Sequence, residues 1–141
     1  MKKKFMPAFA VLATLVLTIA IGLAGCGTDK EPAEENPTVI NITAEEGKGM
    51  MDEDASIVLV DVRTEAEFIE EHIPGAILVP IDDLDTLAPE MMPDKDATYI
   101  IYCRSGNRSA TASQQLIEMG YQNVYDMGGI IDWPYETESG N

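Results

Sequence analysis

Cysteine is nearly absent from this chain of 141 residues, which contains only Cys26 and Cys103. There is also a single histidine. A Cys/His cluster of the kind that binds metal ions is therefore excluded, and we predict no metal site and no other cofactor. Cys26 belongs to an N-terminal pattern that is described below, which leaves Cys103 without a partner for an internal disulfide. We expect a free reactive thiol or an intermolecular partner, the alternative being a buried inert cysteine.

Basic residues are scarce as well. Nine Lys and Arg stand against 25 Asp and Glu, for a net charge of −16, and residues 26–141 hold six of the basic residues and all 25 acids, for −19. Such a field repels phosphate backbones, which excludes nucleic acid as a partner. The simplest role of the charge is solubility. Three of the six basic residues, Arg63, Arg104 and Arg108, nevertheless fall in two motifs, which predicts a small anion site on an acidic body.

Long apolar runs are confined to the N-terminus. Three lysines, Lys2 to Lys4, precede a nearly unbroken apolar run from Ala8 to Leu23, the pattern of a secretory signal peptide. The run ends in Leu-Ala-Gly-Cys26, which resembles a bacterial lipoprotein lipobox. The resemblance implies cleavage before Cys26 and a diacylglycerol on its sulfur, which would anchor the chain to the extracytoplasmic face of a bacterial membrane. The alternative is an uncleaved spanning anchor, since the run approaches the ~20 residues that a span needs.

Four segments follow from this composition. We predict a signal peptide at 1–25, an acidic lipid-anchored linker with two prolines at 26–37, one domain at 38–135 and a disordered tail at 136–141. The sequence contains no internal repeat. It carries no signal for oligomeric state, and a monomer is the default expectation.

Short β-type runs alternate with helical patterns throughout the domain. We expect strands at 38–42, 57–60, 76–79, 98–102 and 123–125. We expect helices at 43–51, 64–69, 82–87 and 108–119, a loop at 89–93, and a turn or short helix at 128–133. Capping boxes open the first two helices. This alternation predicts an α/β fold with a central parallel five-stranded sheet and helices on both faces, whose ligands bind at the carboxyl ends of the strands.

The segment Cys-Arg-Ser-Gly-Asn-Arg at 103–108 is the most informative in the chain. It lies between the apolar run 99–102 and the helical pattern that follows it. A thiol at that point faces backbone N–H groups, the positive end of a helix dipole and two guanidiniums, all of which favour an anion. The sequence therefore predicts a reactive thiolate, or a thiol beneath an anionic sulfur or phosphorus substrate.

Three segments together resemble the rhodanese family of sulfurtransferases. Residues 61–76, Asp-Val-Arg-Thr-x-x-Glu-Phe-x-x-x-His-Ile-Pro-Gly-Ala, resemble its first signature; residues 101–109 resemble its active-site loop; and Gly-Gly-Ile-x-x-Trp at 128–133 resembles its C-terminal signature. Order and spacing match from residue 38 to 133. One departure is Glu71, where the family usually has glycine, and we expect it to affect only a surface turn.

The resemblance implies a single rhodanese-like domain with sulfur chemistry. The Cys103 thiolate would attack the outer sulfur of thiosulfate or a related small anionic donor and become a persulfide, which cyanide or a thiol acceptor would discharge. The N–H groups of residues 104–109 would cradle the sulfur, with Gly106 relieving the tight curl. The substrate-binding residues that it implies are Arg63, Arg104, Ser105, Gly106, Asn107 and Arg108, while Asp61 and Ser109 would be structural.

Three of these residues have a structural alternative. Arg63 aligns with a family position that helps to hold the donor, the alternative being an ion pair. Arg108 begins a helix, and its guanidinium could instead pair with Asp61 and fix the loop. For His72 we favour a place in the turn before a strand over an acid–base role.

Other functions remain open at this point. Cys-dependent phosphatases and arsenate reductases use Cys-x5-Arg, whereas here four residues separate Cys103 from Arg108. A smaller ring suits one sulfur better than a phosphate. A non-catalytic persulfide carrier or redox sensor is the alternative outside enzymes. A thiol–disulfide oxidoreductase is disfavoured because Cys103 lacks a Cys-x-x-Cys partner.

Overall fold

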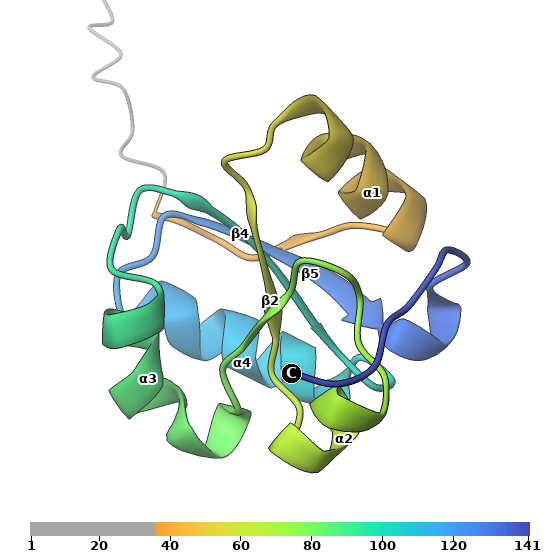
Figure 1. Cartoon of the computed structure of the whole chain (residues 1–141). Coiled ribbons are helices and arrows are strands. Elements are labelled where there is room, and N and C mark those ends of the chain that lie inside the picture. The colour runs from red at the N-terminus through yellow and green to blue at the C-terminus, as the bar shows by residue number, and fades with distance from the viewer. Residues whose placement is uncertain (1–35) are drawn as a thin grey trace, which may run out of the picture. The chain divides into compact units, whose positions relative to one another are not determined.

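A computed structural model describes residues 36–141, and its centre is one parallel sheet with the strand order β1-β5-β4-β2-β3 (Figure 1). The strands are β1 (Ile40–Asn41), β2 (Val58–Asp61), β3 (Ile77–Leu78), β4 (Thr98–Cys103) and β5 (Asn123–Gly129). The helices are α1 (Ala44–Glu53), α2 (Glu65–Glu70), α3 (Leu84–Met91) and α4 (Asn107–Glu118), with 3-10 turns η1 (Ile81–Asp83) and η2 (Ile130–Asp132). The predicted signal peptide, Cys26 and most of the predicted linker lie outside the described residues.

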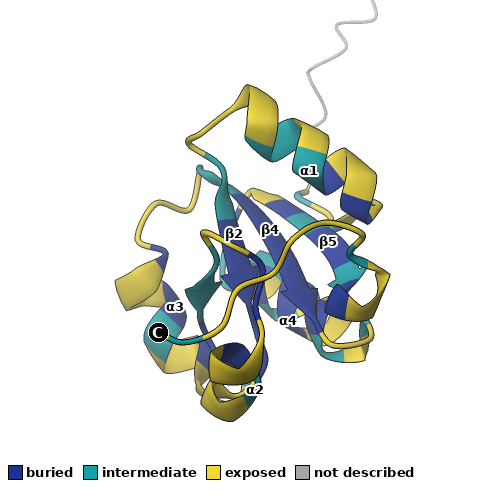
Figure 2. Cartoon of the chain, turned by 45° about the vertical axis from the view of Figure 1, so that its right-hand side comes forward, coloured by how far each residue is buried: buried dark blue, intermediate teal, exposed yellow. Residues whose placement is uncertain are grey.

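The central strand β4 is buried on both faces. Its side chains alternate: Tyr99, Ile101 and Cys103 join the core that also contains residues of α3 and α4, whereas Ile100 and Tyr102 join the core on the side of α1. Figure 2 shows the buried strands between helices whose outer surfaces are exposed. The predicted α/β fold, a five-stranded parallel sheet with helices on both faces, is confirmed.

Both predicted capping boxes form. The hydroxyl of Thr43 accepts from the N–H of Glu46 at 3.1 Å, and the carboxylate of Glu46 accepts from the N–H of Thr43 at 2.7 Å. Thr64 and Glu67 repeat the arrangement at the start of α2, at 3.3 and 3.1 Å. Each box satisfies N–H groups that a helix start otherwise leaves without partners.

Two elements run further than their sequence patterns predict. Residues 89–93 were expected to form a loop, but α3 continues through Pro89 to Met91. Burial explains this, because Leu84, Ala88 and Met92 form one fully buried stripe at helical spacing. Strand β5 was expected to end at residue 125 and reaches Gly129. A bulge next to Met127 carries it onward, with Gly128 at a φ of 83° that favours glycine.

The C-terminal tail is attached to the domain, in contrast to the predicted disorder at 136–141. Glu138 forms an antiparallel bridge with His72, with N–H to C=O distances of 2.8 and 2.9 Å. The N–H of Gly140 also donates to Ile69 at 2.8 Å. Sequence patterns missed this attachment because backbone groups and polar side chains make it, and these leave no apolar periodicity. Within residues 36–141, no helix has the length and apolar character that a membrane span requires.

Ser113 in α4 is the one buried side chain of the described part whose polar atom finds no hydrogen-bond partner. We predict that Ser113→Ala raises the free energy of unfolding by about 1 kcal/mol, because a buried hydroxyl without a partner is destabilising. Urea unfolding measures the change. The exposed Gln114→Ala in the same helix is the control for helix propensity, and a Ser113→Ala variant less stable than wild type would contradict this account.

Candidate active site

The candidate site lies where β2, β4 and β5 end. The register places Asp61 beside Tyr102, and Cys103 beside Gly129. Because parallel strands end at a common edge, the two predicted motifs at 61–63 and 103–108 come together there with the third segment at 128–133. These three segments, together with α2, form the surroundings of the thiol.

The loop from Cys103 to Gly106 curls tightly around the sulfur. Gly106 lies just before α4 with a φ of 102°, in the left-handed region that glycine adopts without strain. Its N–H points back at the thiol, 3.0 Å from Sγ. Cys103 is only 1% exposed.

The ionisation of Cys103 depends on opposing effects. Burial acts to raise the pKa of the thiol. The N–H and hydroxyl of Ser109 and the N–H groups of Gly106 and Ser105 together outweigh burial, and they hold the pKa of Cys103 below its ordinary value. The Ser109 hydroxyl also lies 3.0 Å from the carbonyl oxygen of Gly106 and 3.2 Å from that of Gly128. With one proton, it donates to the thiolate only when it turns away from both carbonyls.

The end of β5 packs against the cysteine loop that follows Cys103. A Cβ at Gly129 would lie 2.4 Å from the carbonyl oxygen of Arg104 and 2.7 Å from Cα of Ser105. Backbone atoms cannot move aside as a flexible side chain can, so this close approach requires glycine. The Gly-Gly pair thus serves two needs: Gly128 adopts a positive φ after the bulge at Met127, and Gly129 allows contact with the cysteine loop.

Arg63 is engaged in an ion pair. Arg63 and Asp61 are both buried. Nε and Nη2 of Arg63 donate to the carboxylate of Asp61 at 2.7 to 3.1 Å. Nη2 also donates to the carbonyl oxygen of Glu71 at 2.6 Å. Burial acts to lower the pKa of Arg63, but Asp61 holds it above its ordinary value, so the guanidinium stays charged. The ion-pair alternative describes this geometry, while the donor-binding role of Arg63 stays a prediction.

Arg108 pairs with Glu67, so the predicted alternative in which Arg108 pairs with Asp61 was wrong. Nη1 and Nη2 of Arg108 donate to the two carboxylate oxygens of Glu67 at 2.8 and 2.7 Å. Asp61 is unsuited to this role because Arg63 already occupies it. Glu67 therefore belongs to the site, and sequence reasoning missed it. Its capping-box position was recognised, but a carboxylate that caps a helix with one oxygen can also bind a guanidinium.

A cavity of about 210 Å³ opens beside the cysteine loop. It is lined by Arg63, Glu67, Glu70, Glu71, Arg104, Ile130 and Ile131. Of the predicted substrate-binding residues, Arg104, Ser105 and Asn107 are exposed at the loop surface, and only Arg63 and Arg104 line this cavity. Glu71 was expected to affect only a surface turn, and that expectation is corrected: Glu71 and its neighbour Glu70 line the cavity, and the carbonyl oxygen of Glu71 accepts from Arg63.

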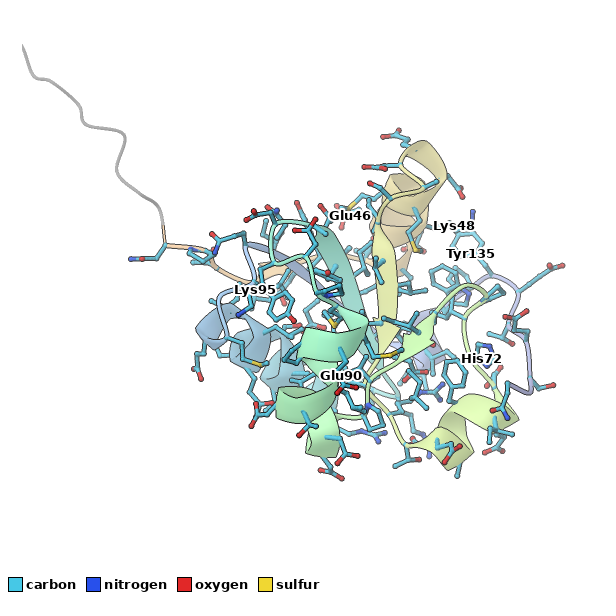
Figure 3. The ribbon with its side chains drawn as sticks, turned by 60° about the vertical axis from the view of Figure 1, so that its left-hand side comes forward. Glu46, Lys48, His72, Glu90, Lys95 and Tyr135 are labelled. Atoms are coloured by element: carbon cyan, nitrogen blue, oxygen red, sulfur yellow. The ribbon has the colours of Figure 1, made fainter. Side chains whose placement is uncertain are left out.

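A larger cavity, of about 660 Å³, lies elsewhere. Its walls come from α1, the turn after His72 and the C-terminal segment: Lys48, Met51, Asp52, Ile73, Pro74, Trp133, Pro134, Tyr135 and Glu136. Figure 3 shows Lys48 beside Tyr135, with Nζ 5.8 Å from the ring centroid. None of these residues belongs to the cysteine loop, so size alone does not locate the chemistry.

His72 has a structural position, as its motif suggested. It is buried between α2 and the C-terminal segment (Figure 3). Its ring stacks on Phe68 at 3.8 Å between centroids, and Nδ1 lies 2.8 Å from the carbonyl oxygen of Phe68. Nε2 lies 3.2 Å from a carboxylate oxygen of Glu138, and this contact connects the C-terminal tail to the end of α2.

Residues 43–134 match the family model of the rhodanese-like domain. The chain belongs to the rhodanese-like domain family. This rhodanese-like chain is 37% identical to thiosulfate sulfurtransferase PspE of Escherichia coli (strain K12) over 73 residues, which cover 52% of the chain and 70% of the relative. It is 36% identical to the putative sulfurtransferase YtwF of Bacillus subtilis (strain 168) over 96 residues, 67% of the chain and 89% of the relative.

Solved structures agree with this assignment. The structure of a rhodanese with anions from E. coli superposes with a TM-score of 0.57 at 33% identity, covering 60% of this chain and 99% of that one. Membership of the rhodanese-like family, together with sulfurtransferase relatives, supports sulfur transfer as the general activity.

The Ser109 hydroxyl offers a direct test of the thiolate. We predict that Ser109→Ala raises the pKa of Cys103, because it removes a hydrogen bond that favours the charged form. The alkylation rate of Cys103 by iodoacetamide, measured against pH, should shift to higher pH. Ser105→Ala is the matched control, since Ser105 contributes through its backbone N–H. Equal profiles for Ser109→Ala and wild type would contradict this role.

The Glu67–Arg108 pair predicts a pH-dependent stability. Hydrogen bonds from Arg108, aided by Thr64 and opposed by burial, lower the pKa of Glu67 from 4.5 to about 2. A lowered folded-state pKa contributes stability above pH 4.5 that is lost as pH falls towards 2. Glu67→Gln should therefore lower the free energy of unfolding at pH 7 by about 1 kcal/mol, given the partial exposure of the pair.

The difference between Glu67→Gln and wild type should narrow as pH falls from 4.5 to 2. Urea unfolding at a series of pH values measures it, with the exposed Glu118→Gln as a control for the loss of one charge. A difference that stays constant over this pH range would show that the pair does not stabilise the fold through the charge of Glu67.

Proposed function

We propose that this protein is a sulfurtransferase that moves a sulfane sulfur from thiosulfate or a related donor, through a persulfide on Cys103, to cyanide or a thiol. The observation that carries the proposal is the buried thiol held below its ordinary pKa by hydrogen bonds from Ser109, Gly106 and Ser105. The likeness to thiosulfate sulfurtransferase PspE supports thiosulfate as a donor.

In the first step the Cys103 thiolate attacks the outer sulfur of thiosulfate. A bond forms between Sγ and that sulfur, the sulfur–sulfur bond of thiosulfate breaks, and sulfite leaves with the electron pair. No general base is needed, because the thiol is already acidic. The outer sulfur of the persulfide carries the negative charge, which the N–H groups of the loop would stabilise.

In the second step an acceptor removes the sulfur. Cyanide or a thiolate attacks the outer sulfur, and the Cys103 thiolate leaves with the electrons of the broken bond. The enzyme thus returns to its starting state without net oxidation or reduction. Splitting the transfer in this way requires only one nucleophile in the protein, which agrees with the single cysteine among residues 36–141.

The small ring disfavours phosphate chemistry at the same thiol. Gly106, two residues before Arg108, donates to Sγ at 3.0 Å, so the curl closes on a single sulfur atom. Arg108 is also held by Glu67 rather than free to bind a tetrahedral oxyanion. We therefore expect no hydrolysis of p-nitrophenyl phosphate.

Mass spectrometry of the intact protein tests the proposal. Treatment with thiosulfate should add the mass of one sulfur atom to Cys103, and cyanide should remove it and release thiocyanate. Cys103→Ser should show neither the adduct nor turnover while keeping the fold. The absence of any adduct in wild type would overturn the proposal, and phosphate release from p-nitrophenyl phosphate would favour the phosphatase alternative.

We propose further that the domain works outside the cytoplasm, anchored as a lipoprotein through Cys26. The support is the lipobox-like Leu-Ala-Gly-Cys26 after an apolar run. In a bacterial host, the mature protein should fractionate with membranes and carry a diacylglycerol on Cys26. Cys26→Ser should abolish lipid labelling, and equal labelling of the two proteins would contradict the anchor.

A further inference from the structure

We propose that the sulfur acceptor is a small zwitterionic thiol of the amino-acid type, whose carboxylate is bound by Arg104 and whose ammonium group is bound by Glu70 and Glu71. This inference rests on the proposed function and names the substrate class that the same site recognises. The observation that supports it is which charged residues of the site form no ion pair within the protein.

Two of the three arginines near Cys103 are neutralised within the protein. Arg63 is buried against Asp61, and the two carboxylate oxygens of Glu67 bind the guanidinium of Arg108. Arg104 is exposed and makes no ion pair within residues 36–141. It is therefore the cation of this cavity that remains available to an anionic group.

Two acidic residues line the same space. Glu70 and Glu71 are exposed, line the 210 Å³ cavity together with Arg104, and form no ion pair within the described part. The Thr137 hydroxyl donates to the carboxylate of Glu71 at 2.8 Å without cancelling its charge. Thr137 lines a second cavity, which shares Glu70 and Glu71 with the first. The first cavity thus presents one positive and two negative groups.

An apolar surface completes the cavity. Ile130 and Ile131 line it, and Ile131 is 65% exposed. The N–H of Ile131 donates to the carbonyl oxygen of Arg104 at 3.3 Å, so the backbone of Ile131 is attached to the cysteine loop. It offers a contact for the methylene that joins a thiol to its charged groups. The small volume admits one molecule of this size.

The charge balance favours an acceptor that carries both signs over an acceptor that carries one. The whole chain carries −16, and the free groups of the cavity add one cation and two carboxylates. A molecule with both signs satisfies Arg104 and the carboxylates together, whereas a molecule with one sign leaves part of the cavity unmatched. Complementary charges of this kind provide discrimination between substrates more than raw affinity.

The chemical step keeps its balance with such an acceptor. The thiol loses its proton to solvent, and its thiolate attacks the outer sulfur of the Cys103 persulfide. The new sulfur–sulfur bond gives the persulfide of the acceptor, and the Cys103 thiolate leaves with the electron pair. No oxidant or reductant is required.

Three thiols that share a two-carbon chain test the proposal. Cysteine carries both charges, 3-mercaptopropionate lacks the ammonium group, and cysteamine lacks the carboxylate. The full-length protein is loaded with sulfur from inorganic polysulfide, and discharge of the persulfide is followed in single turnovers at equal thiolate concentration. Each rate is divided by that of the same thiol with a small-molecule disulfide, because the three thiolates differ in nucleophilicity. On this scale cysteine should react roughly fivefold faster than either analogue, as expected of an exposed charge pair.

Variants assign the preference to residues. Glu70→Gln with Glu71→Gln should remove the advantage of cysteine over 3-mercaptopropionate and keep that over cysteamine. Arg104→Gln should remove the advantage of cysteine over cysteamine and keep its advantage over 3-mercaptopropionate. The matched control is Asp85→Asn with Glu90→Gln in α3, which removes two exposed negative charges outside the cavity and should leave both ratios unchanged.

The outcomes distinguish failure of the proposed function from failure of the proposed acceptor class. A protein that forms no persulfide with thiosulfate or polysulfide overturns the proposed function. A persulfide that forms and then reacts equally with the three thiols overturns the acceptor class alone. Ratios that shift to the same extent in the α3 control would assign the preference to overall charge, which also overturns the proposed role of Glu70 and Glu71.

Discussion

The hydrogen bonds that converge on the Cys103 sulfur are the constraint on which the rest of this structure depends. A thiol that is 1% exposed ordinarily stays protonated, because burial disfavours its charged form. Here the N–H groups of Ser105, Gly106 and Ser109, with the Ser109 hydroxyl, reverse that outcome. They can do so only if the chain curls within four residues at the start of α4, which requires the left-handed Gly106. Gly129 in turn allows the curled loop to lie against β5.

Around the thiol, ion pairs divide the charged residues into structural and available groups. Asp61 with Arg63 and Glu67 with Arg108 hold the ends of β2 and α4 in place, and each pair cancels its own charge. What remains is a small cavity whose unpaired charged residues are Arg104, Glu70 and Glu71. A simple count of arginines suggests an anion site, whereas the paired geometry suggests a site for both signs.

Much of the fold was predictable because its signals are local. The capping boxes at Thr43 and Thr64 join residues three apart, and the alternation of strands and helices needs no knowledge of distant contacts. The errors occur where tertiary packing overrides local pattern. Pro89 remains in a helix because Ala88 and Met92 are buried, and β5 continues past residue 125 because it pairs with β4 to the end.

By itself, the sequence determined the parallel α/β fold and placed a lone cysteine in a loop rich in glycine and arginine before a helix. Both depend on residues that are neighbours along the chain. Only the tertiary structure decided which charges cancel. Glu67 and Arg108 are 41 residues apart, and Asp61 was an equally acidic candidate until Arg63 was seen to occupy it. Glu71 likewise became part of the cavity only when α2 met the cysteine loop. Ion pairs form between groups that the fold brings within about 4 Å, and that proximity is a property of packing rather than of sequence order.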